Sequence, residues 1–382
     1  MTRERNNRVY KWLDGHLGPP IIAMRAAFDV RQRPCDQRVS NRSPRIALVK
    51  TESIGDTLLT EPLIKSIKHA HPVGAITYIC MSNNADAVRG LDGIDEIIIF
   101  DLGAPLRSLC RLTRLRPFDV VIDCGSWARI NSVIATTVPA ACRVGFRTAS
   151  MHRHYAYDIV VDHDSGIHEL DNYRNLLRAA GITPQRSAPR YVIGRQAAGT
   201  PVFPLPSLGE YVVLHIHPGG AQRHLKCWPD AQWIELGRRL IGAGIRIYIS
   251  GGRGDAVDAG RMANLIDGVH CASLAGQLSL DQTAQLIAGS RLLVTVDTGI
   301  MHLGAAVGAN VISLHGPTSP RRWGGIGRSV TPVCTTARCA PCINLGFDSP
   351  CRHGGCMDLI TVDAVFTQAA EHLKRTGRGR PS

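Results

Sequence analysis

A carboxylate that could accept a proton follows the first strand-like run of the chain. The apolar run Ile46–Val49 leads into Lys50-Thr-Glu-Ser-Ile-Gly-Asp56 and then into a helical pattern that continues to Ile67. Gly55 permits close backbone approach at such a turn, and Asp56 falls at the carboxyl end of the strand, where α/β sheets bind ligands. The pattern predicts that Asp56 is a general base for a substrate hydroxyl. The alternative is an aspartate that only caps the helix.

A glycine-rich loop that ends in a lysine follows a later apolar run. Its sequence is His217-Pro-Gly-Gly-Ala-Gln-Arg-His-Leu-Lys226. Gly219 and Gly220 allow backbone amides to face an anion, and Lys226 supplies a positive charge that suits a leaving diphosphate. The loop therefore predicts diphosphate binding. The alternative is a solvated lysine beside a packed Trp228.

A third polar segment joins a strand-like run to a helix start. The run that begins at Leu293 enters Asp297, Thr298 and Gly299, and His302 follows on the same side of the first helical turn. Free amides at a helix start attract pyrophosphate, so these residues are further candidates for donor binding. His302 could equally be a packed or capping residue.

A last Gly/Pro-rich segment, residues 315–323, follows the final strong strand pattern and is expected at the same sheet edge. It could equally be a stiff loop that only closes the domain.

The elements around these segments alternate between short β-branched runs and helical stretches. The runs are Ile76–Ile79, Ile97–Phe100, Val120–Ile122, Val212–Ile216, Ile245–Ile249, Leu292–Val296 and Val311–Leu314. This alternation predicts parallel sheets covered by helices. We therefore predict an α/β protein with two similar doubly wound domains and a ligand cleft between them.

The predicted domain boundaries follow the breaks in this alternation. Residues 1–44 are a basic N-terminal extension, and residues 45–198 form the first doubly wound domain. The Pro/Gly-containing stretch 199–209 is the predicted linker, and residues 210–382 form the second domain.

Composition narrows the class of protein. A chain of 382 residues with 44% apolar and 20% charged residues is long enough for two cores and unlike a disordered chain. No apolar run approaches the roughly 18 residues of a spanning helix, and no secretory cleavage pattern follows the N-terminus, so we predict a cytoplasmic protein. The formal charge of +13 predicts an anionic partner.

Five of the twelve cysteines crowd into residues 334–356. They are Cys334, Cys339, Cys342, Cys351 and Cys356. This segment holds more soft ligands than one tetrahedral zinc needs, and a C-x2-C pair is a good chelate. We predict a structural zinc ion or iron–sulfur cluster, with free thiols as the alternative.

Leucines and arginines alternate at helical spacing between Leu106 and Arg116. A basic amphipathic helix of this kind suits an anionic membrane surface or a phosphorylated lipid acceptor. It predicts peripheral association with the inner face of the cytoplasmic membrane. An ordinary surface helix whose leucines pack on the sheet explains the same pattern.

Taken together and in this order, the motifs resemble those of the ADP-heptose:lipopolysaccharide heptosyltransferases, glycosyltransferase family nine. Members have a basic residue and an S-x-G-D turn after the first strand, H-P-G and K-x-W-P elements, V-D-T-G-x-M-H-L, and F-G-P-T-x-P-x-R-W. The matching segments are 50–56, 217–229, 296–303 and 315–323.

The resemblance implies a GT-B fold with two Rossmann-like domains, an inverting mechanism and no metal for the transfer. It implies that the N-terminal domain binds a glycan or lipid-linked acceptor and the C-terminal domain a nucleotide-diphosphate sugar, with Asp56 as base. The resemblance further implies that the residues in contact with the diphosphate are Lys226, Asp297, Thr298, Gly299 and His302. An acidic residue that contacts the nucleoside corresponds by position to Asp255. The basic extension and the cysteine cluster depart from the family pattern.

Two other functions fit parts of the sequence. A nucleotide-sugar epimerase of the same fold would turn over a donor without any acceptor. A basic, metal-containing nucleic-acid-binding protein would fit the charge and the cysteines. Against it, aromatic residues are only 5% of the chain and are not interleaved with the basic ones, so we expect no nucleic-acid partner.

Overall fold

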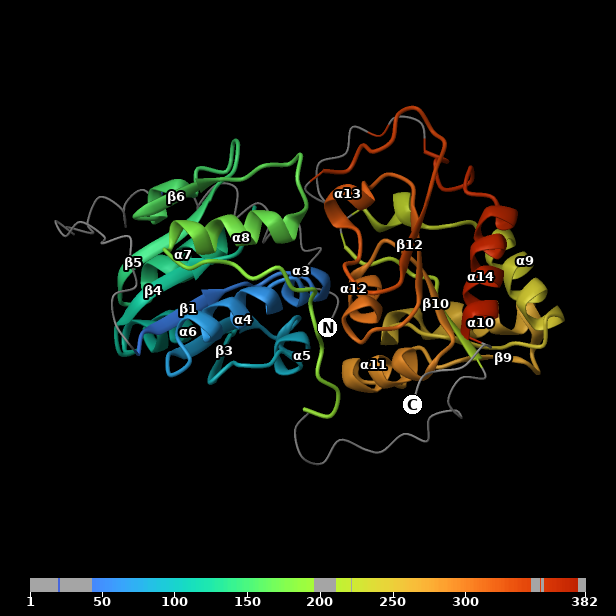
Figure 1. Ribbon diagram of the computed structural model, residues 1–382, viewed down its shortest axis with the longest axis horizontal. Coiled ribbons are helices and arrows are strands. Elements are labelled where there is room, and N and C mark those ends of the chain that lie inside the picture. The colour runs from blue at the N-terminus through green and yellow to red at the C-terminus, as the bar shows by residue number, and fades with distance from the viewer. Residues whose placement is uncertain are drawn as a thin grey trace. The chain divides into compact units, whose positions relative to one another are not determined.

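A computed structural model of the chain describes residues 20, 43–195, 211–220, 222–344, 351 and 354–376. The chain divides into two compact units, Met1–Ser187 and Ala188–Ser382, and Figure 1 shows that each is built of strands and helices. The predicted linker 199–209, and almost all of the predicted extension 1–44, lie outside the described residues.

The first unit is a six-stranded parallel sheet flanked by helices. Its strands are β1 (Arg45–Val49), β2 (Ala75–Met81), β3 (Glu96–Phe100), β4 (Phe118–Asp123), β5 (Ala140–Arg147) and β6 (Ile159–Asp162). Its helices are α3 (Ile54–Leu58), α4 (Glu61–Ala70), α5 (Ala85–Arg89), α6 (Pro105–Thr113), α7 (Arg129–Thr137) and α8 (Glu169–Ala179), with a 3₁₀ turn η1 (His154–Ala156).

The strand order in this sheet is β3-β2-β1-β4-β5-β6, the classic Rossmann order. The direction of winding reverses between β1 and β4, which are hydrogen-bonded neighbours. Ligands of such sheets bind in the crevice beyond the carboxyl ends of the two strands at the reversal. In this unit that position belongs to the residues that follow Val49 and Asp123.

The second unit repeats this plan. Its strands are β7 (Tyr211–His215), β8 (Arg246–Ile249), β9 (Cys271–Ser273), β10 (Leu292–Val296), β11 (Val311–His315) and β12 (Val330–Cys334). Its helices are α9 (Asp230–Gly242), α10 (Ala256–Asp267), α11 (Leu280–Gly289), α12 (Gly299–Ala306), α13 (Pro320–Trp323) and α14 (Val362–Thr376), with 3₁₀ turns η2 (Arg223–Lys226) and η3 (Arg253–Asp255).

The second sheet has the order β12-β11-β10-β7-β8-β9, again fully parallel. It is the same Rossmann order, with the reversal between β7 and β10. Both central strands are completely buried, which fits their largely apolar runs. The prediction of two doubly wound domains is therefore confirmed.

The helix predicted from Asp56 to Ile67 is two helices, so that prediction was wrong in its continuity. The first helix, α3, ends at Leu58, and α4 begins at Glu61 with Pro62 in its first turn. Proline has no N–H group and disfavours helical backbone in the residue before it, so it starts a new helix better than it continues one. Among the described residues, no helix is both long and apolar enough to cross a membrane.

Candidate active site

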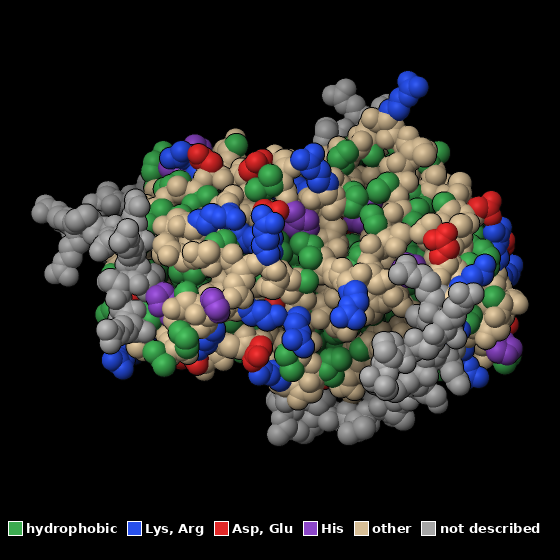
Figure 2. Space-filling model, viewed as in Figure 1, with side chains coloured by type: hydrophobic (Ala, Val, Ile, Leu, Met, Phe, Trp, Pro, Cys, Tyr) green, Lys and Arg blue, Asp and Glu red, His purple; other side chains and the backbone are tan. Residues whose placement is uncertain are grey.

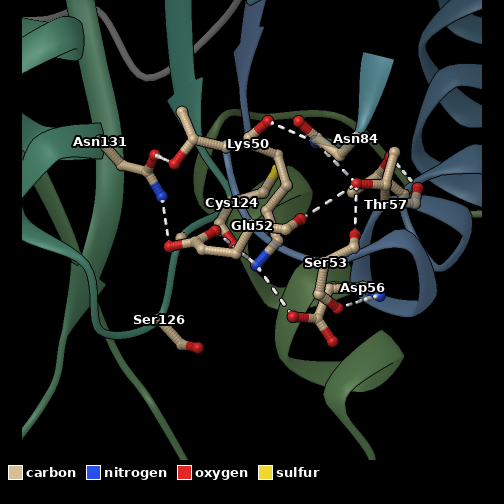
Figure 3. A network of polar contacts seen from close by, with 12 residues as sticks. Lys50, Glu52, Ser53, Asp56, Thr57, Asn84, Cys124, Ser126 and Asn131 are labelled. Atoms are coloured by element: carbon tan, nitrogen blue, oxygen red, sulfur yellow. Dashed lines mark hydrogen bonds and ion pairs between the residues drawn. The ribbon is translucent and has the colours of Figure 1, made fainter. Parts of the chain in front are cut away.

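Lys50 lies at the centre of a polar cluster beyond β1 in the first unit, at the strand-order reversal (Figure 3). Its side chain is only 1% exposed. The Lys50 Nζ atom is 3.1 Å from Glu52 Oε2 and 3.7 Å from Asp56 Oδ2, and it donates a hydrogen bond of 3.2 Å to the carbonyl oxygen of Cys124. One buried ammonium group is therefore shared by two carboxylates and a backbone carbonyl.

The ionisation of this cluster follows from its geometry. Burial works to lower the pKa of the Lys50 ammonium, but the carboxylates of Glu52 and Asp56 outweigh it and raise that pKa above its usual value. Burial likewise works to raise the pKa of Glu52, but Lys50 and Arg153 lower it below its usual value. The cluster therefore holds a charged lysine and a charged Glu52 near neutral pH.

Asp56 stands in the first turn of α3 and is not its cap. The N-cap is Ser53, whose Oγ accepts a hydrogen bond of 3.3 Å from the Asp56 amide, and Ser53 has a φ of 39°. The alternative in which Asp56 only caps the helix is therefore wrong. The Asp56 side chain is 19% exposed, in contrast to the buried Lys50 and Glu52, so its carboxylate is the member of the cluster within reach of a ligand.

Two asparagines fix the turn that carries these groups (Figure 3). Asn131, from α7, donates a hydrogen bond of 2.8 Å to Glu52 Oε1. Asn84 donates to the Lys50 carbonyl oxygen at 3.0 Å and to Thr57 Oγ1 at 2.8 Å. The sequence analysis missed both asparagines and Glu52. Glu52 could have been found because it lies within the first motif, whereas the asparagines reach the cluster only through the fold.

A second buried network supports the adjacent loop after β4. Arg153 Nη2 donates to Asp123 Oδ2 at 2.7 Å, and the Tyr157 hydroxyl donates to the same oxygen at 2.6 Å. Arg153 also bonds to the Gly125 carbonyl oxygen and to Ser132 Oγ. Arg153 and Asp123 have no exposed surface, so the network holds the end of β4 and the loop after it in place.

The second unit brings Lys226 and Asp297 together at its own strand-order reversal. Lys226 Nζ is 2.9 Å from Asp297 Oδ2, and Asp297 directly follows β10. Burial works to raise the pKa of Asp297, but Lys226 and then His315 and His302 lower it to about 2. The Lys226 side chain is 16% exposed, so the interpretation of Lys226 as merely solvated is wrong, although the neighbouring Trp228 is packed as that interpretation held.

The glycine-rich loop lies close to the start of α12. Thr298 is the N-cap of this helix, which begins at Gly299, and a Cβ atom built on Gly219 would lie 3.9 Å from Thr298 Oγ1. Gly220 has a φ of +94°, a conformation that favours glycine. Both glycines are exposed, so the backbone of the loop and the first amides of α12 are close to one another on an accessible surface.

The remaining predicted donor residues lie in different surroundings. His302 is in the first turn of α12 and is buried. Asp255 lies at the end of η3, where its Oδ2 accepts a hydrogen bond of 2.9 Å from the Gly252 amide. The carboxylate of Asp255 thus stabilises its own turn, and its contact with a nucleoside stays a prediction. His315, which the sequence analysis did not assign a role, is buried at the end of β11 and contributes to the low pKa of Asp297.

The cysteines of the predicted metal site range from exposed for Cys334 and Cys339 to buried for Cys356. Burial, followed by the charges of three neighbouring cysteines, raises the pKa of the Cys356 thiol. Those neighbours are Cys342, Cys351 and Cys339. Across the described parts of the chain, no group of three or more His, Cys, Asp or Glu side chains is arranged to hold a metal ion.

Both units have the Rossmann strand order. At the strand-order reversal the first unit carries a carboxylate, and the second carries a lysine and a helix N-terminus. This is the architecture of a GT-B glycosyltransferase. Residues 106–350 match the model of glycosyltransferase family 9 (heptosyltransferase), so the chain belongs to that family. It is 28% identical over 319 residues to lipopolysaccharide heptosyltransferase 1 of Pseudomonas aeruginosa, a match that covers 78% of this chain and 86% of that protein.

Solved structures support the fold. The Escherichia coli heptosyltransferase WaaC with ADP is 21% identical, with a TM-score of 0.67 over 86% of this chain and 99% of that one. The iron-containing dodecameric glycosyltransferase TibC of enterotoxigenic E. coli is 17% identical, with a TM-score of 0.55 over 87% and 77%. The predicted GT-B fold and glycosyltransferase class are confirmed, and the family match supports neither the epimerase nor the nucleic-acid-binding alternative.

Proposed function

We propose that this enzyme transfers a heptose from ADP-heptose to a lipopolysaccharide-core acceptor, with inversion at the anomeric carbon. The names of the relatives support the sugar and the acceptor, and the ADP bound to WaaC supports the nucleotide. The observation that carries the chemistry is the contrast between the two reversals: a partly exposed carboxylate at one, and a lysine beside a helix N-terminus at the other.

In the proposed reaction, Asp56 accepts the proton of the acceptor hydroxyl as its oxygen attacks the anomeric carbon. The bond between that carbon and the diphosphate oxygen breaks, and ADP leaves with the electron pair. Asp56 is suited to this role because its side chain is partly exposed while the charged groups behind it are buried and fixed. The transfer uses only side chains and backbone amides of this chain.

Negative charge that develops on the leaving diphosphate would be stabilised in the second unit. The ammonium group of Lys226 has three N–H donors, so it can bond to a phosphate oxygen while Asp297 holds it in place. The amides of Thr298 and Gly299 and the dipole of α12 would add further donors, and Gly219 and Gly220 leave room for the phosphates. The carboxylate of Asp297 would itself repel the negatively charged diphosphate. Its proposed role is therefore to hold the Lys226 side chain in position.

A coupled assay tests the proposed reaction. We expect ADP release only when ADP-heptose and a heptose-free lipopolysaccharide-core acceptor are both present. Thermal stabilisation by ADP should exceed that by UDP or GDP, and a ligand at 100 times its dissociation constant adds about 2.7 kcal/mol. Release of ADP without an acceptor, or equal stabilisation by all three nucleotides, would contradict the proposal.

We also propose that the cysteine segment binds a structural metal. The mutual influence of the thiols around Cys356 supports their proximity, and TibC, a protein of the same fold, is an iron-containing enzyme. Elemental analysis of protein purified without oxygen should find zinc or iron, and Cys339→Ser with Cys342→Ser should lower both metal content and melting temperature. Metal-free protein with unchanged stability would show that the thiols are only packed.

A cytoplasmic location at the inner membrane face is the third proposal. Helix α6 buries only Leu112 fully, while Leu106 is 77% exposed beside the exposed Arg107 and Arg111. On the face shown in Figure 2, lysine and arginine side chains occur on both units among acidic and hydrophobic ones. We expect the protein to sediment with vesicles of anionic lipid and the variant Leu106→Asp to lose this binding. Equal sedimentation of the variant and the wild type would contradict the proposed membrane surface.

A further inference from the structure

Lys50 is a buried cation for which the proposed chemistry has no direct use. Lysine is almost never fully buried unless it is paired, and Lys50 is 1% exposed. Its ion pair with Glu52 balances its charge, yet a buried ion pair is often no more stabilising than apolar residues of similar volume. Stability alone therefore does not explain the pair. A second carboxylate, that of the proposed base, also lies near the ammonium, with Asp56 Oδ2 at 3.7 Å.

The Lys50 ammonium is fixed from several sides. It donates to the Cys124 carbonyl oxygen beyond β4, and it lies 5.5 Å from the centre of the Tyr173 ring on α8. Glu52, which holds it from the third side, is itself held by Asn131. Because three elements fix the lysine, the Asp56 carboxylate meets a positive charge of defined position.

Other charged or titratable groups near the cluster come from α8, from the residue after β4 and from the residue before η1. Tyr173 and Glu169 lie on α8, and the charge of Asp56 contributes to the raised pKa of Tyr173, after burial and before Glu169. Cys124 is a buried thiol whose pKa burial raises, and Arg153 faces Glu52. Lys50 forms an ion pair with Asp56.

We propose that Lys50 is a positioning residue for the transfer: its ammonium, held by Glu52, orients the Asp56 carboxylate and keeps it ionised for the acceptor hydroxyl. Glu52 has the complementary role, since its negative charge moderates the attraction between Lys50 and Asp56 and so preserves the basicity of Asp56. This proposal rests on the proposed function of Asp56 as the base.

The pH dependence of kcat/KM distinguishes this role from a purely structural one, because its acidic limb reports the base of the free enzyme. Lys50→Met alone would leave two carboxylates without their cation, so the test uses Lys50→Met together with Glu52→Gln. We expect the acidic limb of this double variant to move up by about one pH unit, since Asp56 loses its adjacent cation. Glu52→Gln alone should not move it up, because Lys50 remains.

Two further variants complete the experiment. Lys50→Arg keeps the charge and should restore the wild-type limb. Lys68→Met removes a partly exposed lysine that pairs with Asp95, outside the cluster, and should leave the profile unchanged. An unmoved limb in the double variant, or an equal upward shift in Glu52→Gln, would overturn the role of Lys50.

Asp56→Asn separates this failure from a failure of the proposed function. If Asp56→Asn retains turnover, the base has been misassigned. If it loses turnover while the double variant keeps the wild-type limb, only the inference about Lys50 is wrong.

Discussion

The two units have the same strand order, and each has charged residues at its own strand-order reversal. The units differ in which charge is buried and which is partly exposed. In the first unit a buried Lys50 lies behind two carboxylates, of which Asp56 is the partly exposed one. In the second, Asp297 is the buried group and Lys226 the more exposed one. In each unit, the more exposed member of the ion pair is the charge that a ligand can contact.

This contrast explains how one fold can serve both halves of a transfer reaction. A carboxylate at the surface of its cluster can take a proton from an alcohol, whereas an ammonium group beside a helix N-terminus suits a diphosphate. The counter-charge in each unit lies behind the working group and fixes it. Substitutions that alter the buried partner should therefore affect folding, and those that alter the exposed one should affect ligands.

The largest effect is expected in the buried network of the first unit. Arg153→Met leaves Asp123 without its cation in a site with no exposed surface, so the free energy of unfolding should fall by about 3–5 kcal/mol. The control is Arg147→Met, which breaks an exposed pair with Asp162 and should cost less than about 1 kcal/mol. Urea denaturation measures both. Equal losses in the two variants would mean that burial does not distinguish these pairs.

The next largest effect concerns ligand binding in the second unit. Lys226→Met should weaken ADP binding by roughly 10- to 100-fold, because a hydrogen bond to a charged group contributes about 1.5–3 kcal/mol. Titration calorimetry measures it, with Arg239→Met as control because Arg239 forms exposed ion pairs with Glu235 and Asp363. Unchanged ADP affinity in Lys226→Met would assign the diphosphate to other donors.

Acid should expose the contribution of Asp297 to stability. Its pKa is lowered to about 2 in the folded chain from an ordinary value of 3.8, so it stabilises the fold above pH 4. That contribution, about 2 kcal/mol in total, is lost as the pH falls from about 4 to 2. Urea unfolding at pH 5 and pH 3 should show a larger loss in the wild type than in Asp297→Asn. Parallel losses would contradict the strength of the pair with Lys226.

The smallest effects should come from the glycine loop. Gly220→Ala should cost about 1 kcal/mol because the φ of +94° disfavours a side chain. Gly219→Ala should leave the melting temperature nearly unchanged, since its Cβ atom would have only an ordinary contact with Thr298, but it should weaken ADP binding. If Gly219→Ala bound ADP as well as the wild type, the loop would not face the diphosphate.

Much of the fold was predictable because apolar runs of strand length mark the central strands. β1, β7 and β10 are buried along nearly their whole length, and the sequence shows this directly. The strands that the sequence did not predict are β5, β6, β9 and β12. β5 carries Arg143 and Arg147, and β12 lies at the sheet edge and contains Pro332, features that obscure a strand pattern.

Candidate site residues could be predicted where they follow a strand in the sequence. They could not be predicted where only the folding of distant segments brings them to the site. Asp297 directly follows β10, and Asp56 lies in the first turn of the helix that follows β1, so both lie in segments that the strand pattern marks. The pairing of Lys226 with Asp297 joins residues 71 positions apart, and the contact of Asn131 with Glu52 joins residues 79 apart. Such partners are fixed by strand order and register, which local patterns in a single sequence do not contain.

In the proposed reaction, the first unit performs the proton transfer while the second unit binds the diphosphate. The most direct test measures both properties in Asp56→Asn, which keeps the size of the side chain and removes the proton acceptor. We predict that kcat falls by roughly 10²-fold or more while the dissociation constant for ADP changes less than about twofold. Turnover near the wild-type rate, or a loss of ADP affinity as large as the loss of turnover, would contradict this division of roles.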